Sequence, residues 1–281
     1  MYSANFDYVR AESIDQAVEL LSSHSNARLI AGGHSLIPAI KLRLDNPEMV
    51  IDIGRLEDLK GITWFASKVN LGALTTHAEI AASDQVPAGL RDAASVVGDP
   101  QVRNRGTIGG NISHADPASD LPTMLVALGA KIHLTGPDSS RTVEAGDFFE
   151  GFFETAKNKD EMVLSVEVPT GSVSAYEKLP NPASGYCMVG AGVVVHVEHG
   201  ICTSASVAVG GLTPGPVRCP SVEAALAGKN LDTETIAAAA KMVENDLPED
   251  LLGDMHASEE YRKAMASVYV KRALMKAAGR A

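Results

Sequence analysis

The segment Ala31-Gly32-Gly33-His34-Ser35-Leu36 follows a short apolar run, Arg28–Ala31, which has the character of a β-strand. Adjacent glycines allow positive φ angles and let another group approach the backbone closely. Successive N–H groups in such a turn form a concave site for an anion, and Ser35 adds a hydroxyl donor. The segment therefore predicts a phosphate-binding loop, with a plain turn as the alternative.

A second segment of the same kind, Gly106-Thr107-Ile108-Gly109-Gly110-Asn111, lies farther along the chain. One glycine-rich loop alone is weak evidence for phosphate binding, but two in one chain indicate a ligand that is held from both sides. A dinucleotide has the length to need such a grip. The chain contains neither a G-x-G-x-x-G motif in a Rossmann context nor a G-x-x-x-x-G-K-[ST] motif, so both of these nucleotide-binding classes are disfavoured.

The composition narrows the class of ligand and partner. The formal net charge of −11 argues against a nucleic acid or an anionic membrane as a binding partner. An acidic chain that binds phosphate must neutralise it locally, and the nearest cations downstream of the first loop are Lys41 and Arg43. We therefore expect oriented backbone amides to carry most of the binding.

Hydrophobic periodicity predicts an α+β protein of several subdomains, as 281 residues also suggest. The N-terminal region mixes helices with short strands. After about Gly171 the pattern changes to an antiparallel hairpin followed by a helical bundle. The elements expected are helices near 14–21, 87–97, 121–128, 224–227, 233–244 and 256–278, and strands near 28–31, 49–53, 69–74, 130–134, 163–168, 186–197 and 201–209. Ser13 can cap the first helix, and Thr76 with Glu79 offers a capping box for a further short helix. Glu198-His199-Gly200 would form the turn of the hairpin.

Further motifs extend along nearly the whole chain and make a resemblance specific. They are the two glycine loops together with residues 99–103, 116–120, 176–179, 209–214 and 261–263. With these motifs the chain resembles the FAD-binding medium subunit of the molybdenum hydroxylase family, which includes xanthine dehydrogenase and aerobic carbon monoxide dehydrogenase. The resemblance implies a PCMH-type (vanillyl-alcohol-oxidase-like) FAD-binding region with subdomains 1–55 and 56–176. A C-terminal flavoprotein domain, 177–281, would follow.

The resemblance also implies which residues hold a noncovalent FAD. The two loops would bind the diphosphate and ribityl chain, Val102 and Leu164 would pack near the flavin ring or the adenine, and Asp120 would act through its neighbours. Lys178 would approach the flavin ring, and Tyr186 would cover it. The complete set of cofactor-binding residues is Ala31, Gly32, Gly33, His34, Ser35, Leu36, Val102, Thr107, Ile108, Gly109, Gly110, Asn111, Asp120, Leu164, Lys178 and Tyr186. No metal ligand and no catalytic side chain is expected, because the flavin supplies the redox chemistry.

The three cysteines, Cys187, Cys202 and Cys219, match no zinc or iron–sulfur spacing, and a cluster usually needs four thiolates. By the resemblance, [2Fe–2S] clusters and molybdopterin would sit on a small and a large partner subunit, in a dimer of heterotrimers. The chain would then pass electrons to an external acceptor. The alternatives are a stand-alone flavin oxidase or reductase and a non-redox nucleotide-binding module. The N-terminal residues 1–7 lack the features of a signal peptide, and no apolar run is long enough to span a membrane, so we expect a cytoplasmic protein.

The phosphate-loop interpretation predicts that Gly33→Val abolishes FAD retention. A β-branched residue resists positive φ and blocks the approach of a ligand to the backbone. The measurement is the flavin absorbance of the purified variant per mole of chain. Full flavin occupancy in this variant would show that the loop does not bind the cofactor.

Overall fold

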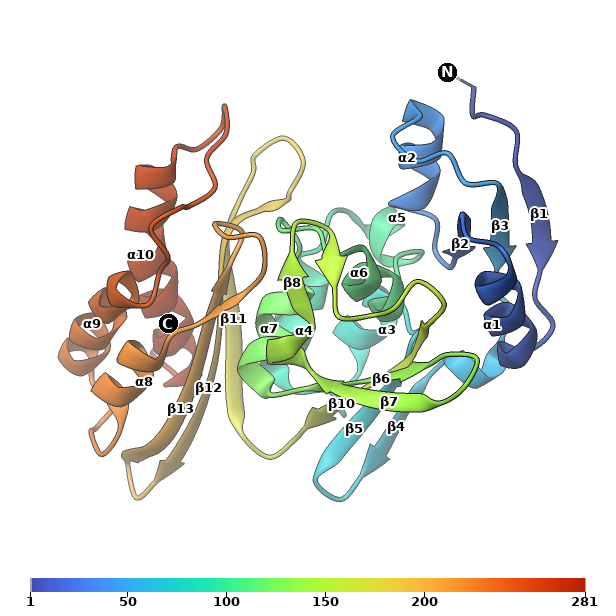
Figure 1. Cartoon of the computed structure of the whole chain (residues 1–281). Coiled ribbons are helices and arrows are strands. Elements are labelled where there is room, and N and C mark those ends of the chain that lie inside the picture. The colour runs from blue at the N-terminus through green and yellow to red at the C-terminus, as the bar shows by residue number, and fades with distance from the viewer. Residues whose placement is uncertain (1, 281) are drawn as a thin grey trace.

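The computed structural model describes residues 2–280. It contains three larger sheets that lie side by side in Figure 1, from the N-terminal unit at the right to the C-terminal helices at the left. The first sheet is parallel, with the order β1-β3-β2, where β1 is Asp7–Arg10, β2 is Ala27–Ile30 and β3 is Met49–Asp52. Because β2 ends at Ile30, the first glycine loop leaves the carboxyl end of a parallel strand.

The helix α1 (Ile14–Ser23) begins where the sequence predicts. The Ser13 hydroxyl accepts a hydrogen bond from the Gln16 amide N–H, and the Gln16 side chain accepts one from the Glu12 amide. The buried face of the helix, Ala17, Val18 and Leu21, packs into the apolar core of the first unit. A second short helix, α2 (Leu36–Leu42), follows the glycine loop directly and was not expected from the sequence.

The second sheet has the order β4-β5-β10-β6-β7 and is antiparallel throughout. Its strands are β4 (Ile62–Phe65), β5 (Lys68–Gly72), β6 (Lys131–Thr135), β7 (Ser140–Glu144) and β10 (Met162–Pro169). Five helices belong to this unit: α3 (His77–Ala82), α4 (Ala88–Ser95), α5 (Pro100–Arg103), α6 (Ile108–His114) and α7 (Leu121–Leu128). A small hairpin of β8 (Phe149–Gly151) and β9 (Glu154–Thr155) lies beside α6 and α7 in Figure 1. Short 3₁₀ turns cover Glu57–Leu59 and Ala145–Asp147.

The third sheet, β11-β12-β13-β14, is also antiparallel. Its strands are β11 (Val173–Pro180), β12 (Cys187–Glu198), β13 (Ile201–Gly210) and β14 (Val217–Arg218). The helices α8 (Pro220–Leu226), α9 (Thr233–Lys241) and α10 (Glu259–Ala277), with a 3₁₀ turn at Met242–Asn245, cover its outer face (Figure 1). The α+β class and the C-terminal antiparallel sheet with helices are therefore confirmed. The division expected at residue 176 falls inside β11.

The helix α7 joins the second and third units. All eight of its residues are buried, and it packs against β12 and β13 through positions without side chains. A Cβ on Gly192 would lie 3.2 Å from the Met124 Cα, and one on Gly210 would collide with the Thr123 hydroxyl. The glycines thus let a helix approach the sheet closely, which fixes the C-terminal sheet beside the loop that precedes α7.

Within residues 2–280, no helix is long and apolar enough to cross a membrane.

Gly109, the second residue of α6, has no room for a side chain, and this predicts an effect on stability. A Cβ on Gly109 would lie 2.6 Å from the Ala73 Cβ and 2.8 Å from its carbonyl oxygen. We expect Gly109→Ala to lower the free energy of unfolding by about 1–3 kcal/mol, because overpacking forces backbone shifts. Thermal melting checks this, with Gly146→Ala as the matched control, since nothing lies within 4 Å of a Cβ at that position. Equal melting temperatures for the two variants would contradict the packing role.

Candidate functional site

The two glycine loops are in contact. A Cβ on Gly32 would collide with the carbonyl oxygen of Arg105, and one on Gly110 would lie 4.0 Å from the Ala31 Cβ. The contact is made by backbone atoms alone, so it adds no side-chain charge to the first loop. The sequence places no cation inside the first loop, and the Arg105 atoms that lie against it belong to the backbone.

The first loop leaves a row of hydrogen-bond donors free. Gly33 has a φ of 78°, and its carbonyl accepts the first bond of α2, from Ile37. Ser35 is the N-cap residue of α2, but its hydroxyl caps no amide. Among residues 2–280, the backbone N–H groups of residues 32–35 have no acceptor. Four consecutive unpaired amides beside the start of a helix fit a group that carries negative charge, such as a diphosphate.

The second loop uses its amides differently. Ile108 N–H donates to the Thr75 carbonyl and Gly109 N–H to the Ala73 carbonyl, both at 2.9 Å, while Gly110 N–H bonds the Thr107 hydroxyl at 3.2 Å. These bonds anchor the start of α6 on the residues that follow β5. The loop is therefore held rigidly, and Gly110, the last of its three glycines, is exposed and lies beside Ala31 of the first loop.

The loop also presents one amide side chain. Asn111 accepts a bond from the Ser119 hydroxyl at 2.9 Å. Its oxygen is therefore fixed, and its NH₂ group, which can donate two bonds, has no acceptor within the described chain. The Asn111 NH₂ group is thus an unpaired donor within residues 2–280.

Asp120 and Lys178 form a buried ion pair, with side chains 5% and 6% exposed and an N–O distance of 2.9 Å. The Tyr176 hydroxyl donates to the other carboxylate oxygen at 2.8 Å. Burial raises the pKa of Asp120 to about 6, and the neighbouring Lys178 ammonium and Tyr176 hydroxyl limit that rise. At neutral pH the carboxylate is therefore ionised and both of its oxygens are bonded within the protein.

Lys178 also holds two backbone segments. Its ammonium donates to the carbonyls of Val96 at 2.8 Å and Gly185 at 2.7 Å, in addition to Asp120. An ammonium has three protons, so the fold accounts for all of them. Lys178 thus connects the segment after α4, the residue before α7 and the turn between β11 and β12. Beside it lies a cavity of about 390 Å³, lined by Gly98, Arg103 and Gly185 among others.

Tyr186 is presented by that β11–β12 turn. The residue is 59% exposed, whereas its backbone is held on both sides. The Tyr186 carbonyl accepts from the Asn181 N–H at 2.7 Å, and the next amide, Cys187 N–H, donates to the Ala118 carbonyl at 3.1 Å. A rigidly held, solvent-exposed aromatic ring can cover the face of a planar ligand at little entropic cost.

The remaining expected residues lie around the loops. His34 is exposed, with Nδ1 3.2 Å from the Gly32 carbonyl. Leu36, the first residue of α2, is half-buried. Val102 is half-buried on α5 and adjoins Gly98. Leu164 lies at the β-bulge of β10 and packs against the core of the first unit, so it occupies the junction between the first two units.

Sequence reasoning missed His77, which lies beneath the second loop. The ring is 3% exposed, and a Cβ on Gly106 would lie 2.8 Å from its Nε2. Its Nδ1 has no hydrogen-bond partner among the described residues. Burial and the nearby Arg103 guanidinium lower the pKa of His77 to about 4. The capping box of Thr76 and Glu79 indicated the helix α3, but no sequence signal indicated that its first residue supports the loop.

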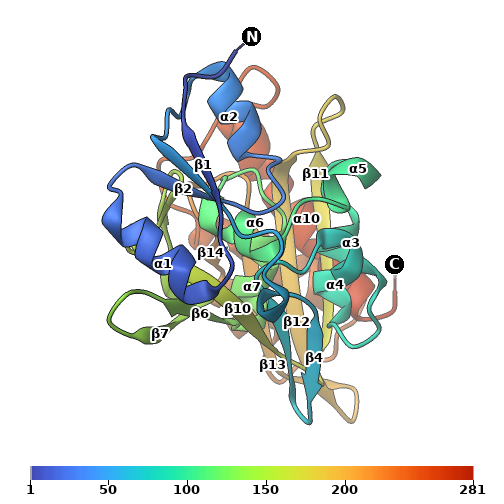
Figure 2. The same cartoon turned by 90° about the vertical axis from the view of Figure 1, so that its right-hand side faces the viewer.

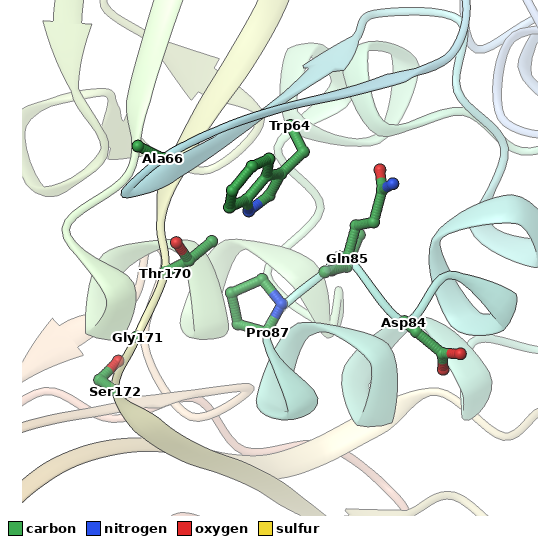
Figure 3. Close-up of a pocket in the computed structure, with 9 residues that line it drawn as sticks. Trp64, Ala66, Asp84, Gln85, Pro87, Thr170, Gly171 and Ser172 are labelled. Carbon is green, nitrogen blue, oxygen red and sulfur yellow. The ribbon is translucent and has the colours of Figure 1, made fainter.

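A cavity of about 530 Å³ lies away from all these residues (Figure 3). Its walls include the Trp64 indole, Pro87 and Thr170. Figures 1 and 2 place the β4–β5 turn at the lower end of the molecule and α2 at the upper end. This cavity is therefore separate from the candidate site.

The buried ion pair predicts an asymmetric effect on stability. Lys178→Met leaves the Asp120 carboxylate buried without its cation, and we expect it to lower the free energy of unfolding by about 3–5 kcal/mol. Adding Asp120→Asn removes the orphaned charge and should restore part of this loss. Chemical denaturation of the two variants and the parent at pH 7 measures both steps. A double variant no more stable than the single one would contradict the pairing.

The neutral His77 predicts a pH dependence. In the unfolded chain the ring is protonated below about pH 6.5, whereas in the folded chain it stays neutral down to about pH 4. The unfolded state therefore binds more protons between these values, and stability falls as the pH drops from 6.5 to 4 by up to about 3 kcal/mol. His77→Leu removes this titration, so its melting temperature should fall less over that window than that of the parent. Parallel melting curves would contradict a buried neutral His77.

Comparison with known proteins agrees with this geometry. The family model for the FAD binding domain in molybdopterin dehydrogenase matches residues 4–171, and that for the CO dehydrogenase flavoprotein C-terminal domain matches residues 174–277. The chain is 38% identical to the glyceraldehyde dehydrogenase medium chain of Sulfolobus acidocaldarius, over 99% of this chain and 100% of that protein. It is 36% identical to the carbon monoxide dehydrogenase medium chain of Afipia carboxidovorans, over 100% of this chain and 99% of that one.

Solved structures give the same result. A chain of carbon monoxide dehydrogenase from Hydrogenophaga pseudoflava superposes with a TM-score of 0.93 at 38% identity, covering 100% of this chain and 99% of that chain. A chain of quinoline 2-oxidoreductase from Pseudomonas putida 86 superposes with a TM-score of 0.92 at 28% identity, covering 100% and 99%. The two glycine loops, the α7 junction and the C-terminal sheet thus belong to one shared architecture. The chain is an FAD-binding medium subunit of the molybdenum hydroxylase family of oxidoreductases.

Proposed function

We propose that this chain binds one noncovalent FAD across its two glycine loops and relays electrons in a molybdenum hydroxylase complex. The observation that carries the proposal is the row of four unpaired backbone amides at residues 32–35. A diphosphate in that position would receive charge-assisted hydrogen bonds, each about 1.5–3 kcal/mol. Such donors suit an acidic chain, because they bind an anion without adding a formal charge.

The other expected residues are proposed to line the cofactor site or to hold the backbone segments around it. The second loop, residues 107–111, would lie along the cofactor, with the Asn111 amide donating to it. Tyr186 would cover the flavin ring. Lys178 and Asp120 would act by holding the segments on either side of that ring, since their own polar groups are bonded within the protein. Val102, Leu164 and Leu36 would contribute apolar contacts.

Bound FAD supplies the ability to accept electrons from one-electron centres and pass them to another acceptor. The chain's own part is to bind, orient and shield the cofactor. Its three cysteines are free and buried, and burial raises the pKa of Cys187 to about 12, so that this residue stays a thiol. Among residues 2–280, no group of three His, Cys, Asp or Glu side chains could hold a metal ion. The iron–sulfur clusters and molybdopterin are therefore proposed on a small and a large partner subunit.

The whole complex is proposed to be a dimer of heterotrimers in the cytoplasm. Relatives that share this architecture are named for glyceraldehyde, carbon monoxide and quinoline. This variety supports a division of labour in which a partner subunit selects the substrate. Carbon monoxide, a heterocycle and an aldehyde are all candidate substrates of the complex. We also propose three structural units, 1–55, 56–172 and 173–281, with the last boundary moved to the start of β11.

The test is to purify the chain with an affinity tag from the cells that produce it and to record its visible spectrum and metal content. The proposal predicts a yellow-brown complex that contains FAD, iron and molybdenum. A colourless chain that takes up no added FAD would contradict it and favour a non-redox module. A yellow chain that is free of iron and oxidises a small substrate unaided would favour a stand-alone oxidase.

A further inference from the structure

The parallel sheet brings one further cation to the first glycine loop. In the order β1-β3-β2, the carboxyl ends of the three parallel strands lie at the same edge of the sheet. The chain leaves β3 at Ile53, whose N–H donates to the Ile30 carbonyl at 3.1 Å. A Cβ on Gly54 would lie 3.9 Å from the Ala31 carbonyl oxygen. Arg55 therefore follows directly after residues that adjoin the start of the first loop.

The Arg55 guanidinium has no partner within the protein. The residue is exposed, and among residues 2–280 its side chain forms no ion pair and no hydrogen bond. Two neighbouring carboxylates are engaged elsewhere. Asp52 accepts from the Tyr8 hydroxyl and from the backbone N–H of the glycine before Arg55, and Glu57 pairs with Lys60 at 2.7 Å. The positive charge of Arg55 is therefore available to a ligand.

The other cations of the first unit are less suited to serve the loop. They are Arg10, Arg28, Lys41 and Arg43. The first two lie 4.0 and 2.8 Å from aspartate oxygens. The last two lie in the final turn of α2 and at its C-cap, at the end of the helix that is remote from the loop. Arg55 is thus the cation of this unit that combines an unpaired side chain with a position beside the loop.

The chemistry of a diphosphate explains why such a cation matters here. The chain carries a formal net charge of −11, and oriented amides offset the repulsion of an anion only locally. A guanidinium adds a full positive charge and a planar set of N–H donors that match two phosphate oxygens. In open sheets with parallel strands, ligands bind beyond the carboxyl ends of the strands. The free amides of residues 32–35 and the free guanidinium of Arg55 both follow strands at that edge.

We infer that Arg55 binds a phosphate oxygen of the cofactor's diphosphate and supplies the positive charge that the first loop lacks. The inference rests on the proposed function, because it requires a diphosphate at residues 32–35. It adds a binding residue that the sequence motifs did not indicate. The role is a contribution to affinity for phosphorylated ligands, and it leaves the redox chemistry to the flavin.

The test measures the dissociation constants of FAD and ADP for the 281-residue chain after removal of its cofactor. Arg55→Gln removes the charge and keeps a polar side chain, whereas Arg55→Lys keeps the charge without the planar fork. The matched control is Arg280→Gln, which removes an exposed arginine near the C-terminus, on the opposite side of the molecule from the parallel sheet (Figure 1). Each constant is measured at low and at high sodium chloride, and melting temperatures report on the fold.

We expect Arg55→Gln to raise both dissociation constants about tenfold at low salt, Arg55→Lys to raise them less, and the control to match the parent. High salt should narrow the gap between Arg55→Gln and the parent, because it screens exposed charges. Unchanged affinity of Arg55→Gln for ADP would overturn the inference. Equal losses in the two Arg55 variants would also overturn it, since they would assign the arginine a structural role. A parent chain that binds neither FAD nor ADP would instead contradict the proposed function.

Discussion

The contact between Gly32 and the carbonyl of Arg105 brings the backbones of the first two units together, beside a junction of apolar side chains. Any side chain at Gly32 would collide with that carbonyl. The backbone of the first loop therefore lies directly on the segment that leads into the second loop. This close approach constrains how the unit of the parallel sheet sits against the unit of the antiparallel sheet, and it places the four free amides of residues 32–35 next to the second loop.

The other parts of the site are connected to the two loops mainly by backbone hydrogen bonds, and less by side-chain contacts. The second loop is held by the Ala73 and Thr75 carbonyls, and α6 and the 114–120 connection continue from it. Lys178 then fastens that connection to the C-terminal sheet by its bond to Asp120. A chain of short-range contacts thus runs from the N-terminal unit to the turn of Tyr186. An acidic protein can in this way assemble an anion site without a cluster of cations, since oriented dipoles provide the attraction.

Local sequence signals predicted those parts of the fold that local physics determines. The sequence predicted the Ser13 cap, the helix at 121–128 and the hairpin turn Glu198-His199-Gly200. Capping, helical burial and turn geometry involve residues that are close in the chain. The sequence predicted the two glycine loops, but it did not predict that the amides of the second loop are bonded within the protein whereas those of the first are free. That difference arises because Ala73 and Thr75 supply acceptors to the second loop, whereas none of the residues 2–280 supplies them to the first.

Pairings across long sequence separations were not predictable from spacing. The prediction that Lys178 approaches the flavin ring gave no indication that its ammonium also donates to Val96, Asp120 and Gly185. His77 was overlooked because a histidine at the start of a helix carries no signal of burial. Arg105 gave no indication that it would adjoin a loop about 70 positions earlier. In each of these cases the residue type is compatible with several roles, and tertiary packing determines which role the residue has.

The central claim is that the free amides of residues 32–35 bind the cofactor's diphosphate. The most direct measurement is a titration of ¹⁵N-labelled, cofactor-stripped chain with ADP, followed by amide chemical shifts. ADP carries the diphosphate without the flavin. The account predicts that the amides of Gly32, Gly33, His34 and Ser35 shift most, and that the internally bonded amides of Ile108 and Gly109 shift less. Binding of ADP that leaves residues 32–35 unperturbed would contradict the account.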